Sequence, residues 1–480
     1  MSVKDISMSK SFCWKLLERF SVQGSQFIIQ VILARLLAPT YYGVLAIMMI
    51  FINLANVIIQ NGFNTALIQN KEVDDDDFST VFWLVLLISI IVYVVLFIAA
   101  PYLAYYYNMS YLENPFKVMA LMLIPGALNS VQLAIIRRSM DFKKEFTSNV
   151  ISIVFAGVVG IICAYNGLGL WSLVVNVLLH TTLSCITMWH VIGWRPRLVF
   201  DWARIKVLFS YGYKLVIAGL LDALSNDLSA FIIGIKYNAA SLGFYTRGRQ
   251  FPNAIMGVIN SAVQSVMLPV LSMLQDDKAR AKELMRKSMI LSAFIVFPMM
   301  AGLAGIAEPM VLMLLTDKWV ECVPYLQIFC FSFAFWPVHT SNLQAINAMG
   351  RSDIFLKLEV IKKFTWFLAL FVAVTFFNTP LAIASMGIIT TITSCFINCY
   401  PNKKILNYSY IEQMKDIFPY FFLSITMFLG LLFINDLTSN YLLNIIMQII
   451  IGCVFYIFAS KILGLEAYFI AYSRLKSLGK

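Results

Sequence analysis

Fourteen long apolar runs, separated by charged residues, Pro or Gly, constrain this chain more than any other feature of its sequence. They lie near 21–38, 43–62, 79–99, 116–136, 148–165, 170–192, 210–234, 241–262, 288–306, 324–344, 362–377, 380–398, 416–434 and 441–461. A helix needs about 20 apolar residues to cross the hydrocarbon core of a bilayer. Only 13% of the residues are charged, against about 25% in soluble domains. We therefore predict an all-α polytopic membrane protein with about 14 transmembrane helices.

The positions of the basic residues predict how the chain is oriented in the membrane. The net charge is +11, and most of the 36 Lys and Arg residues lie in the two termini and in every second segment between runs. This alternation follows the positive-inside rule and places both termini in the cytoplasm. Residues 1–20 mix basic and aromatic residues, which is typical of an amphipathic helix at the membrane interface. Because the charge follows the membrane topology, we expect no nucleic-acid partner.

The chain repeats parts of its own pattern after about 200 residues. An offset of 200 takes Gly43 to Gly243 and also relates three polar positions, Asn53, Gln60 and Asn64, to Asn253, Asn260 and Gln264. An offset of 212 takes Pro125 to Pro337, where each proline should kink a span. We interpret this as an internal duplication. The predicted parts are a six-helix bundle at 21–200, a second at 201–410, and two additional helices with a cytoplasmic tail at 411–480.

Polar residues inside the apolar runs form stripes on single helix faces. Asn253, Asn260 and Gln264 follow Arg249 at helical spacing, and Asn53, Asn56 and Gln60 share a face in the first half. A charge at the centre of a spanning helix costs roughly 2.5–3.5 kcal/mol. We therefore expect the matched stripes to face one shared water-filled cavity. The competing use is hydrogen bonding between helices, worth about 0.6 kcal/mol per bond.

Several other residues have two interpretations from sequence alone. The acidic run at 70–78, NKEVDDDDF, is interpreted as a solvated turn in preference to a regulatory or cation site. His339 is interpreted as a hydrogen-bonded structural residue in preference to a proton relay. The eight cysteines are scattered and only three histidines occur, so we expect no metal site, no cofactor and no His-based catalysis.

Four motifs in order resemble one family of transporters. They are NDLSAFIIGIKYNAASLGFYTRGRQFP, the following VMLPVLSMLQDD, GLGLWSLVV before HVIGWRPRLVF, and LQAINAMGRSDIFLKLE. Together with the fourteen spans they resemble bacterial polysaccharide-unit flippases, the Wzx-type branch of the MOP exporter superfamily, over residues 10 to about 410. The resemblance implies two six-helix bundles around a central cavity lined by spans 1, 2, 7 and 8. It also implies transport of an undecaprenyl-pyrophosphate-linked oligosaccharide for lipopolysaccharide or exopolysaccharide synthesis in the bacterial cytoplasmic membrane.

A pyrophosphate and a glycan need different groups from such a cavity. Arg binds phosphate oxygens through a planar fork, so Arg249 is the first candidate for the pyrophosphate, followed by Arg35, Lys236 and Arg247. Arg247 lies on another side of the helix from Arg249, and snorkelling or pairing is an equal alternative for Arg247, Arg35 and Lys236. Amides suit sugar hydroxyls, and the candidates for the sugar or the cavity lining are Gln26, Gln30, Asn53, Asn56, Gln60, Asn253, Asn260 and Gln264.

The sequence contains no GxxxxGK[ST] motif for binding ATP. Transport would therefore use an ion gradient or consumption of the product, and Asp222, Asn226 and Asp227 are candidates for a coupling H⁺ or Na⁺. A cation-coupled multidrug or metabolite antiporter is the first alternative function. A membrane polysaccharide polymerase is the second, although the chain has no sizeable outward loop for catalytic groups. We expect no enzyme activity, and the expected partners are the lipid-linked substrate, the membrane and other polysaccharide-assembly proteins.

Overall fold

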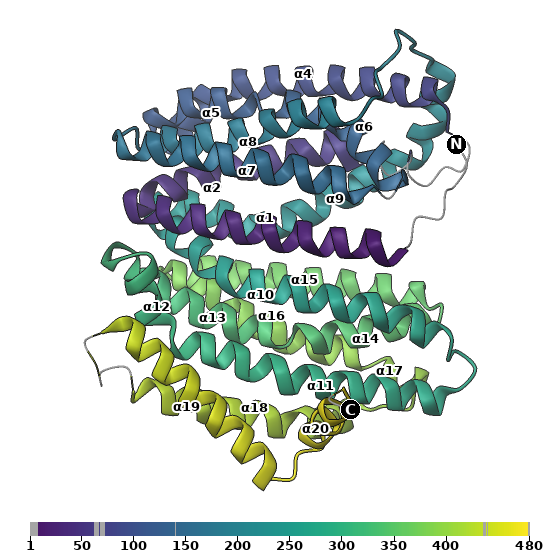
Figure 1. Cartoon of the computed structure of the whole chain (residues 1–480), viewed down its shortest axis with the longest axis vertical. Coiled ribbons are helices and arrows are strands. Elements are labelled where there is room, and N and C mark those ends of the chain that lie inside the picture. Colours follow the sequence, from purple (N-terminus) through teal and green to yellow (C-terminus); the bar gives the residue numbers. More distant parts are fainter. Residues whose placement is uncertain are drawn as a thin grey trace. The chain divides into compact units, whose positions relative to one another are not determined.

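The helices of this chain pack into two units. The computed structural model describes residues 8–61, 67, 73–139, 141–434, 438 and 440–478. Within these ranges every regular element is a helix, as Figure 1 shows. Unit 1 is Met1–Gly243 and unit 2 is Phe244–Lys480. A backbone that crosses lipid must satisfy its N–H and C=O groups internally, and helices do so within each segment.

Unit 1 is a bundle of long helices with two short interruptions. α1 packs along α7, α7 along α8, α4 against α5 and α6, and α2 against α8 and α9. The elements are α1 (Met8–Leu36), α2 (Pro39–Asn56), the π-helix η1 (Val57–Asn61), α4 (Asp75–Tyr106), η2 (Ser110–Leu112), α5 (Glu113–Ala120), α6 (Leu123–Ser139), α7 (Phe142–Tyr165), α8 (Leu170–Val191), α9 (Trp202–Lys236) and the first turn of α10 (Ala239–Ser272).

Unit 2 contains the rest of α10 and the helices that follow it. α11 packs against α13, α14 and α18, α15 packs against α16, and α19 packs against α12 and α18. The elements are α11 (Lys278–Gly305), α12 (Ala307–Leu314), η3 (Asp317–Cys322), α13 (Val323–Ala334), α14 (Trp336–Ala348), α15 (Ser352–Phe376), α16 (Pro380–Cys399), α17 (Asn402–Ile405), α18 (Tyr410–Leu432), α19 (Tyr441–Ile462) and α20 (Glu466–Leu478).

The number of helices agrees with the sequence-based prediction. Twelve helical segments of the described residues are long and apolar enough to cross a membrane. α1 and α15, with 29 and 25 residues, are two further long helices at the predicted spans 21–38 and 362–377. The predicted class, an all-α multi-pass membrane protein, is confirmed, and the predicted count of about fourteen spans is approximate, since twelve candidate spans occur among the described residues. The division between units follows α9, whereas the predicted boundary at 200 lies before it. The first boundary reflects packing and the second a sequence repeat, so the predicted domains stay a prediction.

The N-terminal prediction is only partly within the described structure. Residues 1–7 lie outside the described residues, and α1 runs without a break from Met8 to Leu36. The stretch predicted as a separate interfacial helix, 1–20, is therefore continuous from Met8 with the first predicted span.

Matching prolines mark a helix break in each unit. In unit 1, α5 ends at Ala120 and α6 begins at Leu123, two residues before Pro125. In unit 2, α13 ends at Ala334 and α14 begins at Trp336, with Pro337 in its first turn. Proline lacks an N–H and its ring clashes with the preceding turn, so it fits the start of a helix better than its interior. The predicted distortion occurs at both places, as a break between two helices.

A buried amide network connects the C-terminal helices to the rest of unit 2. Asn342 on α14 donates to Gln413 Oε1 on α18 at 2.9 Å, and Asn402 donates to Asn342 Oδ1 at 2.7 Å. All three side chains are fully buried. His339, one turn earlier on α14, lies 3.1 Å from Asn398 Nδ2 through its Nδ1. Asn398 Oδ1 and Asn402 Oδ1 are buried without a donor in the described structure, so the network is only partly satisfied, but its direct hydrogen bonds favour one arrangement of these helices. This environment supports the structural interpretation of His339.

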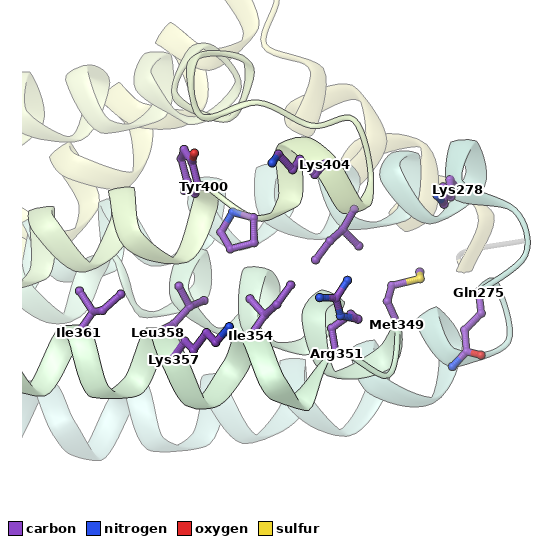
Figure 2. A pocket seen from close by; sticks show the side chains of 12 residues that line it. Gln275, Lys278, Met349, Arg351, Ile354, Lys357, Leu358, Ile361, Tyr400 and Lys404 are labelled. Atoms are coloured by element: carbon purple, nitrogen blue, oxygen red, sulfur yellow. The ribbon is translucent and has the colours of Figure 1, made fainter.

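Unit 2 also contains a cavity of about 660 Å³, shown in Figure 2. Its walls come from the first turns of α15 and from the segment where α16 ends and α17 begins. Lysine and isoleucine side chains line it together. The cavity therefore combines positive charge with apolar surface.

Close helix contacts depend on glycine at specific positions. A Cβ added at Gly43 would lie 1.6 Å from the carbonyl oxygen of Ala239, and one at Gly243 would lie 2.3 Å from that of Pro39. These glycines are the pair that the 200-residue offset relates, and both belong to unit 1. In unit 2, a Cβ at Gly248 would lie 2.7 Å from the Cβ of Tyr325. Only glycine allows the backbones to approach this closely.

Replacing Gly248 by Ala should destabilise the protein, since the new methyl group would also lie 2.8 Å from the backbone nitrogen of Leu326. We expect Gly248→Ala to lower the free energy of unfolding by about 1–3 kcal/mol. At Gly257, on the same helix, a Cβ would meet no other described part of the chain within 4 Å, so Gly257→Ala should be neutral or stabilising by up to about 1 kcal/mol. Thermal and denaturant unfolding of the purified protein measures both. Equal effects of the two changes would contradict the close contact at Gly248.

Candidate functional site

The polar residues of α2 and α9 come together in unit 1. Asn53 Nδ2 lies 3.4 Å from Asp227 Oδ2, which joins the two helices. Asn226 donates to Asp222 Oδ2 at 3.1 Å along α9. The candidates for the coupling ion therefore adjoin the amide stripe of α2. Their role toward H⁺ or Na⁺ stays a prediction.

The stripe on α2 continues into a distorted turn. Residues Val57–Asn61 form a π-helix directly after α2, and Gln60 donates to Asn56 Oδ1 at 3.1 Å within this region. Short π-helical segments are uncommon and often lie at functional sites. Gln60 also faces Gly126, where an added Cβ would lie 3.7 Å from Gln60 Nε2. Asn64, the predicted end of this stripe, lies outside the described residues.

The amides of α1 and α10 differ in what they contact. Gln26 on α1 is exposed and makes no hydrogen bond with the described residues, whereas Gln30 is half-buried and engaged. On α10, Asn253 and Gln264 are exposed, and neither forms a hydrogen bond within the described part of the chain. Asn260, between them, accepts a hydrogen bond from the hydroxyl of Thr340 on α14. Asn260 thus serves helix packing, while the other two amides on α10 are available to a ligand.

Arg247 and Arg249 are two residues apart and have different environments. Arg247 is 4% exposed; its guanidinium carbon lies 5.2 Å from the centre of the Trp319 ring, and Nη1 donates to Gln250 Oε1 at 2.6 Å. A cation over an indole face is stabilised by the ring quadrupole. Arg249 is half-buried. Helical positions two apart point in nearly opposite directions, so the structure separates the two arginines as the helix phase predicts.

The two remaining candidate cations lie at equivalent helix ends in unit 1. Arg35 is exposed in the last turn of α1, and Lys236 is exposed in the last turn of α9, with its ammonium 5.7 Å from the centre of the Tyr237 ring. A cation in the last turn also interacts favourably with the negative end of the helix dipole. Both a structural and an anion-binding role fit these positions. Their assignment to the pyrophosphate stays a prediction.

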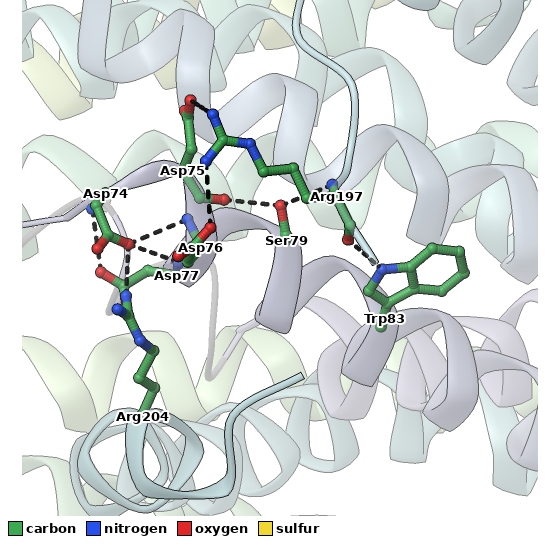
Figure 3. Close-up of polar contacts among 8 residues, drawn as sticks. All are labelled: Asp74, Asp75, Asp76, Asp77, Ser79, Trp83, Arg197 and Arg204. Atoms are coloured by element: carbon green, nitrogen blue, oxygen red, sulfur yellow. Dashed lines mark hydrogen bonds and ion pairs between the residues drawn. The ribbon is translucent and has the colours of Figure 1, made fainter. Parts of the chain in front are cut away.

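Sequence reasoning did not anticipate how the acidic run is used. Asp74 caps α4 by accepting hydrogen bonds from the backbone N–H groups of Asp76 and Asp77, at 3.1 and 2.8 Å. Arg204 on α9 donates to Asp77 Oδ1 at 2.9 Å and also to Asp74. Arg197 lies 3.5 Å from Asp75 and 3.4 Å from Asp76. Figure 3 shows all four carboxylates directed toward the two arginines.

The acidic cluster, Asp74–Asp77, therefore holds the segment between α8 and α9 against the start of α4. The backbone N–H of Arg197 donates to Ser79 Oγ at 3.0 Å, and Trp83 Nε1 donates to the Arg197 carbonyl at 2.8 Å. Acidic residues at a helix N-terminus are also favoured by the helix dipole. The interpretation of this run as a turn is wrong for Asp75–Asp77, which begin α4 and form ion pairs, although the side chains of Asp74 and Asp75 are exposed to solvent as predicted. The signal in the sequence was the basic segment beginning at Arg195, predicted on the same side of the membrane.

The Arg204 guanidinium holds the pKa of Asp74 well below its usual value of 3.8, at about 2. A lowered pKa in the folded state contributes stability above the unfolded pKa, and this contribution is lost as the pH falls toward the folded pKa. The melting temperature of the wild-type protein should exceed that of Arg204→Gln by a constant amount above about pH 5. The difference should shrink between about pH 4 and pH 2. Differential scanning fluorimetry of the purified protein measures both curves.

Lys206 provides the matched control for this experiment. It is exposed two positions further along α9 and forms no ion pair with the described residues, so Lys206→Gln should follow the wild-type curve at every pH. A difference for Arg204→Gln that stays constant down to about pH 2 would contradict the role of the Asp74 carboxylate.

The described residues contain no group of three or more His, Cys, Asp or Glu side chains that could hold a metal ion. The polar groups that the structure brings together are amides, carboxylates and guanidinium groups. These bind hydroxyl groups, small cations and anions.

This chain is similar to known proteins in both sequence and fold. A family model described as "Polysaccharide biosynthesis protein" matches residues 32–324. The succinoglycan biosynthesis transport protein ExoT of Rhizobium meliloti (strain 1021) is 23% identical over 415 residues, covering 86% of this chain and 82% of that protein. The lipopolysaccharide biosynthesis protein WzxC of Escherichia coli (strain K12) is 22% identical over 434 residues, covering 88% and 87%.

Solved structures show the same fold at low sequence identity. The lipid II flippase MurJ in its inward closed conformation matches with a TM-score of 0.75 at 14% identity, over 94% of this chain and 98% of that one. An inward-facing multidrug resistance MATE family transporter of the MOP superfamily matches with a TM-score of 0.59 at 13% identity, over 86% and 98%. This helical fold is thus shared by more than one kind of transporter.

Proposed function

This chain belongs to the polysaccharide biosynthesis protein family, and on that premise we propose that it is a flippase. It translocates undecaprenyl-pyrophosphate-linked oligosaccharide units across the bacterial cytoplasmic membrane by alternating access, for the synthesis of surface polysaccharide. The family resemblance inferred from the four motifs is confirmed. Relatives named as polysaccharide transport or biosynthesis proteins, ExoT and WzxC, support this substrate class. The same relatives support a role in transport, and we propose that this role includes no catalytic step.

Exposed amides on spanning helices carry the proposal. Gln26, Asn253 and Gln264 are exposed and form no hydrogen bond with described residues. An amide moved from water to hydrocarbon without a hydrogen-bond partner costs roughly 2–7 kcal/mol. A water-filled path removes this cost, and a glycan can then replace the water, because its hydroxyl groups both donate and accept hydrogen bonds. We propose that these amides contact the oligosaccharide.

The pyrophosphate needs fixed positive charge along the same path. Arg249 is half-buried on the face that also carries Asn253. Arg247 is held in the interior of unit 2 by Trp319. Arg249 is therefore the first choice for the pyrophosphate ligand in this proposal, and Arg35 and Lys236, at helix ends of unit 1, are the further candidates. In this proposal Arg247 does not contact the pyrophosphate and stabilises the helix packing through Trp319 and Gln250.

Substitution of Arg249 tests the charge requirement. Arg249→Ala should reduce export of the lipid-linked unit on the order of ten- to a hundredfold, because a hydrogen bond to a charged group contributes about 1.5–3 kcal/mol. Arg249→Lys should retain part of the activity, since it keeps the charge but loses the bidentate geometry. Accumulation of the lipid-linked unit in the inner leaflet, measured at equal protein abundance, gives the readout.

Lys117 supplies a control cation for that experiment. It is already paired with Glu113 at 2.6 Å, so Lys117→Ala should export normally. Normal export by Arg249→Ala, together with failure of Arg35→Ala or Lys236→Ala, would move the anion site to the ends of α1 and α9.

Two amides on α10 separate the sugar-binding role from helix packing. Asn253→Leu should lower export and leave the melting temperature unchanged, because Asn253 has no hydrogen-bond partner among the described residues. Asn260→Leu should lower the melting temperature, since it leaves the Thr340 hydroxyl without its acceptor; the expected cost is about 1–3 kcal/mol. Export assays and thermal unfolding of both variants distinguish sugar binding from helix packing. Destabilisation by Asn253→Leu equal to that by Asn260→Leu would assign both residues to packing.

We further propose that both termini are cytoplasmic, from the alternation of basic segments. Tyr106 and Asn378 are exposed at predicted outer loops, and Lys206 and Lys403 are exposed at predicted inner ones. In a background without the native cysteines, single cysteines at the first pair should react with a membrane-impermeant maleimide added to intact cells. Those at the second pair should react only after lysis. Labelling of the Lys403 position in intact cells would reverse the orientation.

A further inference from the structure

Three lysines surround the cavity in unit 2. Lys278 begins α11, Lys357 lies on α15 and Lys404 lies on α17, and all three line the cavity of about 660 Å³. Figure 2 shows them on different walls of this one space. None of the three forms an ion pair or a hydrogen bond with the described residues. Within the described structure, the cavity thus gathers uncompensated positive charge from three separate helices.

Several other basic side chains in this part of the chain are paired. Lys282 lies 3.4 Å from Glu412, Lys362 lies 2.5 Å from Glu359, and Arg286 lies 2.7 Å from Glu466. Arg351, which also lines the cavity, forms two hydrogen bonds of 2.9 Å with the carboxylate of Asp353. The carboxylates of these four pairs are therefore engaged with other cations. Like charges collected around one space repel each other, and a bound anion would relieve that repulsion.

One wall of the cavity is apolar and continues along a spanning helix. Ile354, Leu358 and Ile361 line the cavity from α15, and their spacing of four and three residues places them on one helix face. Leu368, seven residues further along, continues that face and is 54% exposed. An apolar wall does not stabilise a small anion that is free in solution. It does stabilise a lipid, because the acyl chain can lie along α15 while the headgroup occupies the cavity.

From this combination we propose that the cavity is a binding site for an anionic phospholipid. The phosphate is held by Lys278, Lys357 and Lys404, and an acyl chain follows Ile354, Leu358 and Ile361. Basic pockets between spanning helices on the cytoplasmic side are suited to anionic headgroups, and the volume lies in the range of small-molecule sites. Tyr400, 73% exposed at the rim, suits the interface between membrane and water. This site lies wholly within unit 2 and does not include any residue assigned above to the oligosaccharide.

Native mass spectrometry of the full-length protein with defined lipids tests the proposal. We expect dioleoylphosphatidylglycerol to be retained more strongly than dioleoylphosphatidylcholine, and glycerol 3-phosphate not to compete at millimolar concentration. The triple variant K278Q/K357Q/K404Q should bind phosphatidylglycerol on the order of ten- to a hundredfold more weakly. Its binding of phosphatidylcholine should not change.

A second triple variant controls for the loss of three charges. Lys206, Lys403 and Lys415 are exposed, form no ion pair with the described residues and do not line the cavity. K206Q/K403Q/K415Q should bind phosphatidylglycerol as the wild type does, and the melting temperature of both variants reports whether they fold. Equal binding by K278Q/K357Q/K404Q and the wild type would overturn the site, and so would an equal loss in both variants.

Two further ligands distinguish the sources of the phosphate. Competition by glycerol 3-phosphate as effective as that by the whole lipid would show a site for a free phosphate compound and overturn the lipid proposal. Undecaprenyl pyrophosphate that binds here in preference to phosphatidylglycerol would show a substrate site and overturn the assignment to a phospholipid. Preference for phosphatidylglycerol over both supports it.

Discussion

The cost of placing a polar group in hydrocarbon governs this structure at every level. It requires helices, because only a helix satisfies its backbone groups within one segment. It also requires each polar side chain on those helices to find a partner or water. Asn342 meets the requirement inside unit 2 by donating to Gln413 and accepting from Asn402. Asn253 and Gln264 form no hydrogen bond within the described structure, and this difference is the reason we propose that they face a ligand.

Charged groups meet the same requirement in three ways. Arg247 is buried against an indole ring. The carboxylates of Asp74–Asp77 form ion pairs with Arg197 and Arg204. The lysines of the unit 2 cavity have no carboxylate partner in the described residues. The first two arrangements are complete without a ligand and serve the architecture. In the third arrangement the positive charge of the lysines is not compensated within the described structure, as in a binding site without its anionic ligand. The absence of a carboxylate partner in the described residues is therefore the reason we propose a ligand for the lysines of the cavity.

The acidic cluster also holds the connection between α8 and α9 in a defined position. The segment between α8 and α9 contains no regular helix over 192–201, so no helix hydrogen bonds fix it. Ion pairs and hydrogen bonds to the start of α4 do so instead, through the side chain and the backbone of Arg197. Exposed ion pairs contribute little when single. Four carboxylates and two guanidinium groups in one network hold the segment at several points.

The sequence by itself determined the features that depend on residues close together in the chain. Run length fixed the spanning helices, Pro125 and Pro337 fixed the breaks, and helical phase separated Arg247 from Arg249. The order of the four motifs was sufficient to identify the family. Only the tertiary structure decided which partner each polar residue has: Trp319 for Arg247, Thr340 for Asn260, and Arg204 for Asp74. Periodicity is set by neighbours a few residues apart, whereas a hydrogen bond between residues 80 or 130 positions apart depends on how whole helices pack. The three lysines of the cavity come from three helices for the same reason, and no local pattern brings them together.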